Sequence, residues 1–323
     1  MKSPPNKIIV ICGPTAVGKT DLSLQVAETF SCEIIGVDSM QVYRHMNIGT
    51  AKPTKAERAR ICHYLIDIVD PDENYTLGRF VKDAGEAIQK IHSHNNIPLL
   101  VGGTGLYFKG LLEGVCDEND FASEKHADKK KNNTKSVKDE LRKRLQEEGN
   151  EILHRELAEM DPDSAERIHP NDTQRLLRGL EIFYTTGIPW SQHLAKQNKN
   201  TSQYDVIKIG LTRSRQELYE RIDQRVRLMA EKGLLDEVRK LLAMGYDKKL
   251  KPMQSIGYRH MINFLDGVWN WEQTLDFLAR DTRHYAKRQF TWFSHDQAIT
   301  WYDVWQKDEI IKDIKKFLIQ DSL

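Results

Sequence analysis

An octapeptide near the N-terminus constrains this chain more than any other feature of its sequence. Residues 13–20 read Gly-Pro-Thr-Ala-Val-Gly-Lys-Thr and fit the pattern G-x-x-x-x-G-K-[ST] in full. The apolar run Lys7–Cys12 before them predicts a buried strand, and the spacing of apolar residues in Lys19–Phe30 predicts a helix after them. A strand, a glycine-rich turn and a helix in this order are typical of a phosphate-binding loop, or P-loop.

The residue types of this loop suit an anion. Gly13 and Gly18 allow the backbone to curl so that several N–H groups face one phosphate. Lys19 is expected to neutralise phosphate oxygens, and Thr20 to place its hydroxyl on Mg²⁺. We therefore predict a diphosphate site formed by Gly13, Pro14, Thr15, Ala16, Val17, Gly18, Lys19 and Thr20, with Mg²⁺ as cofactor.

Further short apolar runs alternate with helical patterns and predict the fold class. Strands are expected at Glu33–Val37, Tyr64–Val69, Ile97–Val101, Asp205–Leu211 and Ala298–Tyr302, and an amphipathic helix at Arg79–His92. Such alternation favours an α/β fold, namely a P-loop NTPase-like parallel sheet flanked by helices.

The pattern breaks after Val115. Asp117–Val137 holds few large apolar residues and many charges, and helical spacing then runs from Lys138 to about His193. We expect an all-helical insertion domain at 116–195. The α/β core would comprise residues 1–115 and 196–323, with a helical C-terminal part.

Charge and cysteine content narrow the partners and the compartment. The 48 Lys and Arg residues against 47 Asp and Glu residues give a formal net charge of +1, so any nucleic-acid site must come from local clusters. Asp120–Arg144 and Arg280–Arg288 are such clusters, unless they are merely solvated charge. Four scattered cysteines without a C-x-x-C pair argue against a zinc site or a disulfide framework and favour the cytoplasm. No apolar run is long enough to span a membrane.

Two further positions follow predicted strands. Asp38 comes directly after Glu33–Val37, and in an open α/β sheet the loops at the carboxyl ends of strands surround the ligand. Asp38 is a candidate metal ligand, general base or helix cap. Gln41 offers a donor and an acceptor to a base edge. Thr104 follows Ile97–Val101 and is either a residue of the site or a simple N-cap.

The P-loop alone does not say whose phosphate is bound. A kinase or NTPase would act on a γ-phosphoryl group, whereas a transferase would use pyrophosphate as a leaving group. Other residues must separate these two classes.

Seven motifs in order along nearly the whole chain resemble those of the bacterial tRNA dimethylallyltransferases, also called isopentenyltransferases. They are the P-loop, Asp38–Thr54, His63–Pro71, Pro98–Gly114, Arg167–Phe183, Gln254–Met261 and Ala286–Phe293. The lysine-rich segment Val115–Val137, which lacks proline, departs from the family's pattern.

The resemblance implies transfer of a dimethylallyl group from dimethylallyl diphosphate to N6 of adenosine 37 in tRNA. It assigns Asp38 as the general base, Thr15 to a place near the bridging oxygen, and Thr20 to the metal. It assigns Arg225 to the diphosphate, with Arg221 as the alternative. The chemistry fits, because the P-loop would stabilise the pyrophosphate as it leaves.

The resemblance also implies contacts with the anticodon stem-loop of tRNA by an enzyme expected to be a monomer. The target adenosine must leave its stack to reach the P-loop. The implied contacts are Asp38, Ser39, Met40, Gln41, Thr104, Gln174, Arg175, Leu176, Leu177, Arg178, Gly257 and Tyr258. An adenylate isopentenyltransferase, a small-molecule kinase and a non-catalytic RNA-binding protein are the rival interpretations.

Overall fold

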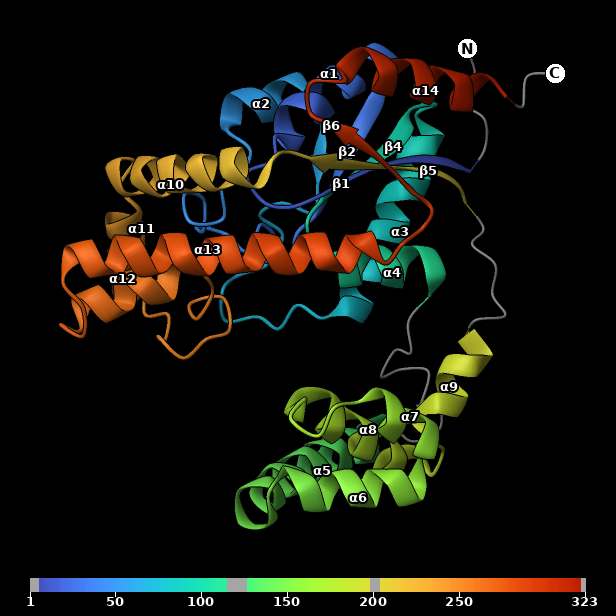
Figure 1. Ribbon diagram of the computed structural model, residues 1–323, viewed down its shortest axis with the longest axis vertical. Coiled ribbons are helices and arrows are strands. Elements are labelled where there is room, and N and C mark those ends of the chain that lie inside the picture. The colour runs from blue at the N-terminus through green and yellow to red at the C-terminus, as the bar shows by residue number, and fades with distance from the viewer. Residues whose placement is uncertain (1–5, 115–126, 198–203, 321–323) are drawn as a thin grey trace. The chain divides into compact units, whose positions relative to one another are not determined.

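The computed structural model describes residues 6–114, 127–197 and 204–320 (Figure 1). The chain divides into two compact units. The first comprises residues 1–111 and 203–323, and the second comprises residues 112–202.

A six-stranded parallel sheet organises the first unit, as the alternating pattern predicts. Its strand order is β3-β2-β4-β1-β5-β6. The strands are β1 (Lys7–Cys12), β2 (Cys32–Val37), β3 (His63–Tyr64), β4 (Ile97–Gly102), β5 (Asp205–Thr212) and β6 (Ile299–Asp303). The central strand β1 is buried along its whole length, which is why it contains only apolar residues after Lys7.

The register brings several strand ends together. Cys12 of β1 pairs with Gly102 of β4 on one side and with Gly210 of β5 on the other, and Gly102 pairs with Val37 of β2. Because the strands are parallel, the loops after β1, β2, β4 and β5 all leave from the same edge of the sheet.

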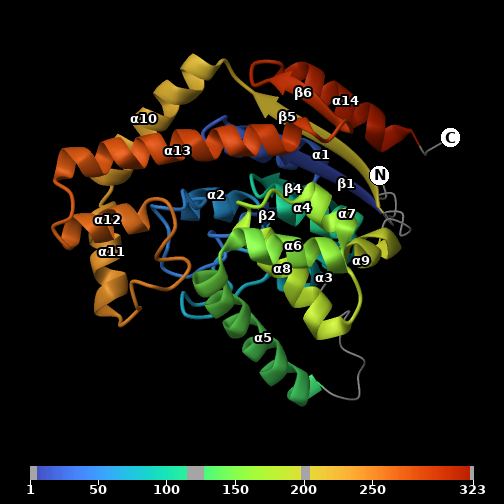
Figure 2. The ribbon, with the colours of Figure 1, turned by 60° about the horizontal axis from the view of Figure 1, so that its bottom comes forward.

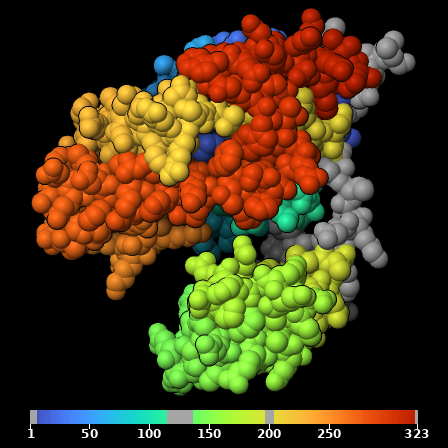
Figure 3. Space-filling view, in the orientation of Figure 1, coloured from blue at the N-terminus to red at the C-terminus, as the bar shows by residue number. Residues whose placement is uncertain are grey.

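Helices cover both faces of the sheet and continue beyond it. They are α1 (Lys19–Phe30), α2 (Lys55–Arg60), α3 (Leu77–Ser93), α4 (Gly105–Glu113), α10 (Arg215–Glu231), α11 (Leu234–Ala243), α12 (Tyr258–Leu265), α13 (Trp271–Ser294) and α14 (Lys307–Ile319). Figures 1 and 2 show α10 and α13 extending from the sheet towards α11 and α12. In Figure 3 the orange atoms of α13 lie beside the yellow atoms of α10 on one face of this unit.

The core of the first unit lies between the sheet and its helices. Ile9 and Ile11 of β1 and Ile209 of β5 are fully buried, and they belong to one apolar cluster with Leu22 and Val26 of α1. The four-residue spacing of those two α1 residues places both on the face that meets the sheet.

The second unit is entirely helical in its described part. It contains α5 (Ala127–Glu148), α6 (Asn150–Met160), α7 (Pro162–Arg167), α8 (Thr173–Thr186) and α9 (Trp190–Gln197). Its own apolar core is formed by Leu141, Leu153, Leu157, Ala165, Ile168, Leu176 and Leu180. Among the described residues of the chain, no helix is long and apolar enough to cross a membrane.

One expected strand is mostly absent. A strand was expected at Tyr64–Val69, but β3 ends at Tyr64. Leu65 and Asp67 have positive φ angles of 61° and 57°, and a chain with these angles cannot continue as a strand. Only an isolated bridge between Val69 and Tyr43 follows. The apolar pattern is real, but Leu65, Ile66 and Val69 are buried by a folded loop.

Candidate active site

The P-loop forms the strand–turn–helix unit that its sequence predicts. Gly13 has a φ of 142°, and a Cβ at this position would lie 2.7 Å from the backbone oxygen of Leu211. Gly18 has a φ of 115° and begins α1 without a side-chain cap, unlike α3, which Thr76 caps. The N–H groups of the first turn of α1 are therefore available to an anion, as a phosphate site requires.

Lys19 folds back onto the loop. Its Nζ atom donates to the backbone oxygens of Gly13 at 2.9 Å and Pro14 at 2.8 Å. Burial lowers the pKa of Lys19 to about 8, and the charge of Arg225 acts in the same direction, while Asp38 acts against it. Val37, the residue before Asp38, pairs with Gly102, and Gly102 pairs with Cys12, the residue before the P-loop. Asp38 and the P-loop therefore leave the sheet at the same edge, with β4 between their strands.

Both candidate diphosphate arginines reach the P-loop from α10. Arg225 is partly buried, and its Nη1 atom donates to Thr15 Oγ1 at 3.1 Å. Arg221, one turn earlier, donates from Nε to the backbone oxygen of Ala16 at 2.8 Å and is exposed. Burial, followed by the charge of Arg221, lowers the pKa of Arg225. Two guanidinium groups thus face one turn of backbone, and bound anions would relieve their repulsion.

A third arginine was missed by the sequence analysis. Arg213 follows β5 directly, and its Nε atom donates to the backbone oxygen of Val17 at 2.8 Å. Its guanidinium group lies 4.8 Å from the ring centroid of the exposed Trp305. The signal that could have found it is its place at the carboxyl end of a strand, which is the criterion that selected Asp38 and Thr104.

The Asp38 carboxylate is held by the turn that follows it. Its Oδ1 atom accepts from the N–H groups of Met40 at 2.8 Å and Gln41 at 3.2 Å. Within the described residues, Oδ2 forms no hydrogen bond. The alternative interpretation, a cap for a following helix, is wrong, because a turn and not a helix follows Asp38. Oδ1 accepts hydrogen bonds within this turn, while Oδ2 remains available as an acceptor.

Thr104 connects the loop after β4 to the loop after β2. Its Oγ1 atom accepts from the N–H of Ser39 at 3.3 Å, and its own N–H donates to the backbone oxygen of Val37 at 3.3 Å. Thr104 is partly exposed and lies beside Asp38, where the two loops meet. The structure thus brings Ser39 and Thr104 together, as expected from their strand positions.

Gln41 is oriented by its own loop. Its Nε2 atom donates to the backbone oxygens of Thr50 at 3.1 Å and Ala51 at 3.4 Å. The amide nitrogen is thereby engaged, so the Oε1 atom is the group that Gln41 can offer to a ligand. The neighbouring Met40 is partly exposed in the same turn.

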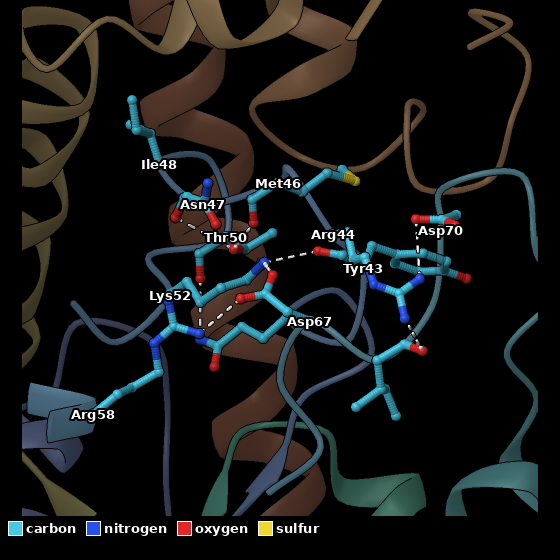
Figure 4. Close-up of polar contacts among 12 residues, drawn as sticks. Tyr43, Arg44, Met46, Asn47, Ile48, Thr50, Lys52, Arg58, Asp67 and Asp70 are labelled. Atoms are coloured by element: carbon cyan, nitrogen blue, oxygen red, sulfur yellow. Dashed lines mark hydrogen bonds and ion pairs between the residues drawn. The ribbon is translucent and has the colours of Figure 1, made fainter. Parts of the chain in front are cut away.

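A buried lysine fixes the remainder of this loop (Figure 4). Lys52 Nζ donates to the backbone oxygen of Tyr43 at 2.7 Å and to Asp67 Oδ1 at 2.5 Å, and Arg58 pairs with Asp67 Oδ2 at 2.7 Å. The backbone N–H of Asp67 also donates to the backbone oxygen of Gln41. The Asp67 carboxylate therefore joins Lys52 and Arg58 and ties both to the loop after β2.

Gly257 and Tyr258 were expected to contact tRNA, and the structure contradicts this for the Tyr258 side chain. Tyr258 is 0% exposed, and its hydroxyl donates to Glu237 Oε1 at 2.6 Å. A Cβ on Gly49 would lie 2.4 Å from the Tyr258 ring, so the two are in close contact. Gly257 is also buried, with a φ of 98°, and packs beside Gly49. This motif supports the loop after β2 from behind.

Glu237 of α11 was also missed by the sequence analysis. Its carboxylate accepts from the backbone N–H groups of three consecutive residues, Asn47, Ile48 and Gly49, at 2.9 to 3.2 Å. No sequence signal marks a glutamate on an amphipathic helix as the partner of a loop 190 residues away.

The candidate RNA contacts on α8 divide into two groups. Gln174 and Arg175 are exposed, and Arg178 pairs with Glu181 at 3.1 Å. Leu176 is 0% exposed within the core of the second unit, and Leu177 packs partly buried against that core. The expected contact of the Leu176 side chain with tRNA is therefore wrong, because this side chain is buried in the core of the second unit.

The side chains of the site can be compared with those that a Mg²⁺ ion requires. Within the described part of the chain, no group of three or more His, Cys, Asp or Glu side chains could hold a metal ion. Thr20, the second residue of α1, is partly exposed and offers one hydroxyl oxygen. Magnesium in proteins is commonly bound by one or two side chains together with substrate phosphates and water. These residues therefore fit a magnesium ion that arrives with a diphosphate.

The chain is similar to known proteins in sequence and in structure. A family model described as IPP transferase matches residues 41–296, and one described as isopentenyl transferase matches residues 6–68. The tRNA dimethylallyltransferase of Desulfotalea psychrophila is 46% identical over 316 residues, which cover 98% of this chain and 96% of the relative. That of Thermotoga maritima is 42% identical over 322 residues, covering 98% and 99%.

Two solved structures are similar over most of the chain. The full-length tRNA isopentenylpyrophosphate transferase of Bacillus halodurans has a TM-score of 0.71 and 38% identity, and the match covers 98% of each chain. A eukaryotic dimethylallyltransferase acting on tRNA has a TM-score of 0.80 and 30% identity, and the match covers 97% of this chain and 78% of the other.

Proposed function

This chain belongs to the IPP transferase family, and we infer from that membership that it is a tRNA dimethylallyltransferase, an enzyme that transfers a dimethylallyl group to adenosine in tRNA. We further propose that the donor is dimethylallyl diphosphate and that the acceptor is N6 of adenosine 37. The observation that supports the finer proposal is the position of Asp38, which leaves β2 at the same edge of the sheet as the P-loop, with Oδ2 not engaged in a hydrogen bond within the described residues.

The P-loop would bind the diphosphate of the donor. As the allylic C–O bond breaks, negative charge grows on the departing pyrophosphate, and the backbone N–H groups of the loop would stabilise it. Thr15 and Arg225, which are hydrogen-bonded to each other, would act nearest the bridging oxygen. Lys19 would turn from the loop carbonyls to the phosphate oxygens. With the hydroxyl of Thr20 as its protein ligand, a Mg²⁺ ion would supply further charge neutralisation.

Asp38 would be the general base. The exocyclic amine of adenine is a poor nucleophile because its lone pair is delocalised into the ring. The free Oδ2 atom of Asp38 would accept a proton from N6 as the new C–N bond forms. The Oε1 atom of Gln41 would accept a hydrogen bond from the flipped adenosine.

The tRNA would be bound through its anticodon stem-loop in the cytoplasm, by a monomeric enzyme. Thr104 and the turn that contains Ser39 and Met40 would lie against the target nucleotide. The exposed Arg175 and the neighbouring Arg178 on α8 would contact phosphates or stacked bases. Residues 120–126 of the basic segment Asp120–Arg144 lie outside the described residues, and the role of the segment remains a prediction.

Mass spectrometry of tRNA nucleosides tests the proposal. The protein is incubated with dimethylallyl diphosphate, Mg²⁺ and an anticodon stem-loop that carries adenosine at position 37. We expect the mass of one added dimethylallyl group on that nucleoside alone. Equal or better transfer to AMP would favour an adenylate isopentenyltransferase, and label transfer from γ-labelled ATP without any prenyl donor would favour a kinase.

A further inference from the structure

Gln289 of α13 connects two loops of the site, and neither the proposed reaction nor the resemblance assigns it a role. Its Oε1 atom accepts from the backbone N–H of Thr15 at 2.8 Å, and its Nε2 atom donates to the backbone oxygen of Gly103 at 2.9 Å. One carboxamide thus joins the P-loop to the loop after β4. Gln289 is 6% exposed, so neither bond competes with bulk water.

The backbone of the loop after β4 packs closely against α13 around this carboxamide. A Cβ on Gly103 would lie 2.1 Å from Gln289 Nε2, and a Cβ on Gly105 would lie 2.0 Å from the Trp292 ring. The helix therefore rests directly on the backbone of the Gly103–Gly105 segment. Gly103 does not have a positive φ, so the close approach of α13, rather than backbone conformation, favours glycine there.

A second residue of α13 extends the connection to the loop that carries Asp38. Tyr285, one turn before Gln289 on α13, lies close to Thr104 and Gln289. Thr104 in turn accepts from the N–H of Ser39. Burial, followed by the charge of Asp38, raises the pKa of Tyr285, so its hydroxyl stays protonated at neutral pH. One helix face thus contacts the loops after β1 and β4 and, through Thr104, the loop after β2.

We propose that Gln289 is a positioning residue that fixes the separation between the diphosphate loop and the loops that hold the acceptor adenosine. This inference rests on the proposed function. Prenyl transfer requires the allylic carbon to lie within reach of N6 while the pyrophosphate departs in line. A misplacement of about 1 Å in such a geometry costs on the order of 10²-fold in rate. Because Gln289 is buried and both ends of its carboxamide bond to backbone atoms, it acts through the backbone of Thr15 and Gly103.

Replacement of Gln289 by methionine tests the kinetic consequence. Q289M keeps the volume of the side chain and removes both hydrogen bonds. We expect kcat to fall by about 30- to 100-fold, while the Kd for inorganic pyrophosphate and the KM for tRNA each change by less than about threefold. The matched control is Q25M, because Gln25 is exposed on α1. A kcat within about twofold of the parent protein, or an equal loss of pyrophosphate affinity, would overturn the proposal.

A second variant reaches the same contact from the other side. G103A places a methyl group where Gln289 Nε2 lies, and should displace the carboxamide. If both substitutions break one connection, their effects on kcat should be strongly non-additive in the double variant. Fully additive losses would contradict the inference. Should Q289M fail to fold, Q289N carries the same kinetic expectation, because its shorter side chain cannot span both partners.

Hydrogen exchange of the P-loop peptide supplies a readout that does not depend on activity. The Thr15 N–H should exchange faster in Q289M than in Q25M, since its acceptor is lost. Unchanged exchange would refute the contact itself. Absence of a prenylated product with the unsubstituted protein would instead refute the proposed function, while the exchange result would still report on the contact.

Discussion

Asp38 uses its two carboxylate oxygens differently, and this separation makes its proposed role testable at the scale of single residues. Oδ1 accepts from Met40 and Gln41 and so shapes the turn that follows β2. Oδ2 is the oxygen proposed to take the proton. Asparagine keeps an acceptor for the turn but is not a base, so it separates the two tasks.

We expect D38N to lower the rate of prenyl transfer by about 10²–10⁴-fold, the usual contribution of a general base. Binding of tRNA and of pyrophosphate should stay within about threefold of the parent values, since the turn keeps its acceptor. Single-turnover kinetics with excess enzyme measure the first quantity and equilibrium titrations the second. Normal turnover by D38N would rule out Asp38 as the base.

Arg225 and Arg221 can be ranked by their positions. Arg225 is partly buried and bonded to the Thr15 side chain, whereas Arg221 is exposed and bonded to a loop carbonyl. Loss of a charge-assisted hydrogen bond costs about 1.5–3 kcal/mol. R225M should therefore weaken pyrophosphate binding by about 10- to 150-fold, and R221M by clearly less. Calorimetric titration with pyrophosphate and Mg²⁺ checks this, and a larger effect of R221M would reverse the assignment.

His260 gives the fold a pH dependence. It is 0% exposed, accepts from the Gly257 N–H, and faces Asp281, Arg259 and the ring of Trp269. Burial, followed by the charge of Arg259, lowers its pKa to about 4, although Asp281 opposes the shift. In the unfolded chain, this histidine binds a proton near pH 6.5. The folded protein therefore has its full stability with respect to His260 above pH 6.5, and it loses that contribution as the pH falls towards 4.

The comparison of the parent protein with H260N isolates this titration from that of the carboxylates. Above pH 6.5, the difference in unfolding free energy between the two proteins should be constant. Between pH 6.5 and 4, the unfolding free energy of the parent should fall by about 3 kcal/mol relative to that of H260N. Urea unfolding at a series of pH values measures it. Parallel pH profiles for the two proteins would show that His260 is not the responsible group.

At the scale of elements, the loop after β2 depends on helices far away in sequence. The ion pair of Lys52 and Asp67 holds the loop internally. Glu237 of α11 and Tyr258 of α12, which are hydrogen-bonded to each other, hold it from outside the loop. A carboxylate that accepts three consecutive backbone N–H groups behaves like a cap for a loop with no regular structure of its own. The motif around Gly257 thus supports the loop that carries Asp38 and Gln41.

Replacement of Glu237 by glutamine should loosen this loop without changing the volume of the side chain. We expect the free energy of unfolding to fall by about 1–3 kcal/mol, and the KM for tRNA to rise more than the KM for the prenyl donor. E231Q is the control, because Glu231 is exposed at the end of α10. Urea unfolding and steady-state kinetics give both readouts. Equal KM changes for the two substrates would argue against a role confined to the acceptor side.

At the scale of the whole molecule, the formal net charge is only +1, so RNA binding must depend on locally exposed basic side chains. Arg175 is one of these, with a side chain 59% exposed and a salt bridge of 3.5 Å to Asp172. Such an exposed pair contributes little to stability, so the guanidinium is free to exchange partners.

Binding of the anticodon stem-loop should therefore weaken steeply between low and moderate salt. In a plot of log affinity against log salt concentration, R175Q should have a slope shallower than the parent by about one. Fluorescence anisotropy with a labelled stem-loop measures these slopes. A flat response of the parent protein would contradict a phosphate-dominated interface.

The sequence determined the α/β fold class, the P-loop and the position of Asp38 at the carboxyl end of a strand, because these follow from local patterns. A glycine-rich turn between an apolar run and a helical pattern has few alternative structures. Parallel strands place their carboxyl ends along one edge, which explains why Asp38, Thr104 and the P-loop were selected together. The family motifs then supplied the chemistry that spacing alone left open.

Only the tertiary structure decided which residues support the site. Arg213, Glu237 and Gln289 contact loops from which they are separated by about 190 to 270 residues, and no local pattern encodes such contacts. It also showed that Leu176 and Tyr258 are core residues, since a motif records neighbours in sequence and not the face that is buried. Long-range hydrogen bonds and side-chain burial are properties of the packed chain, so they emerge only when the elements are assembled.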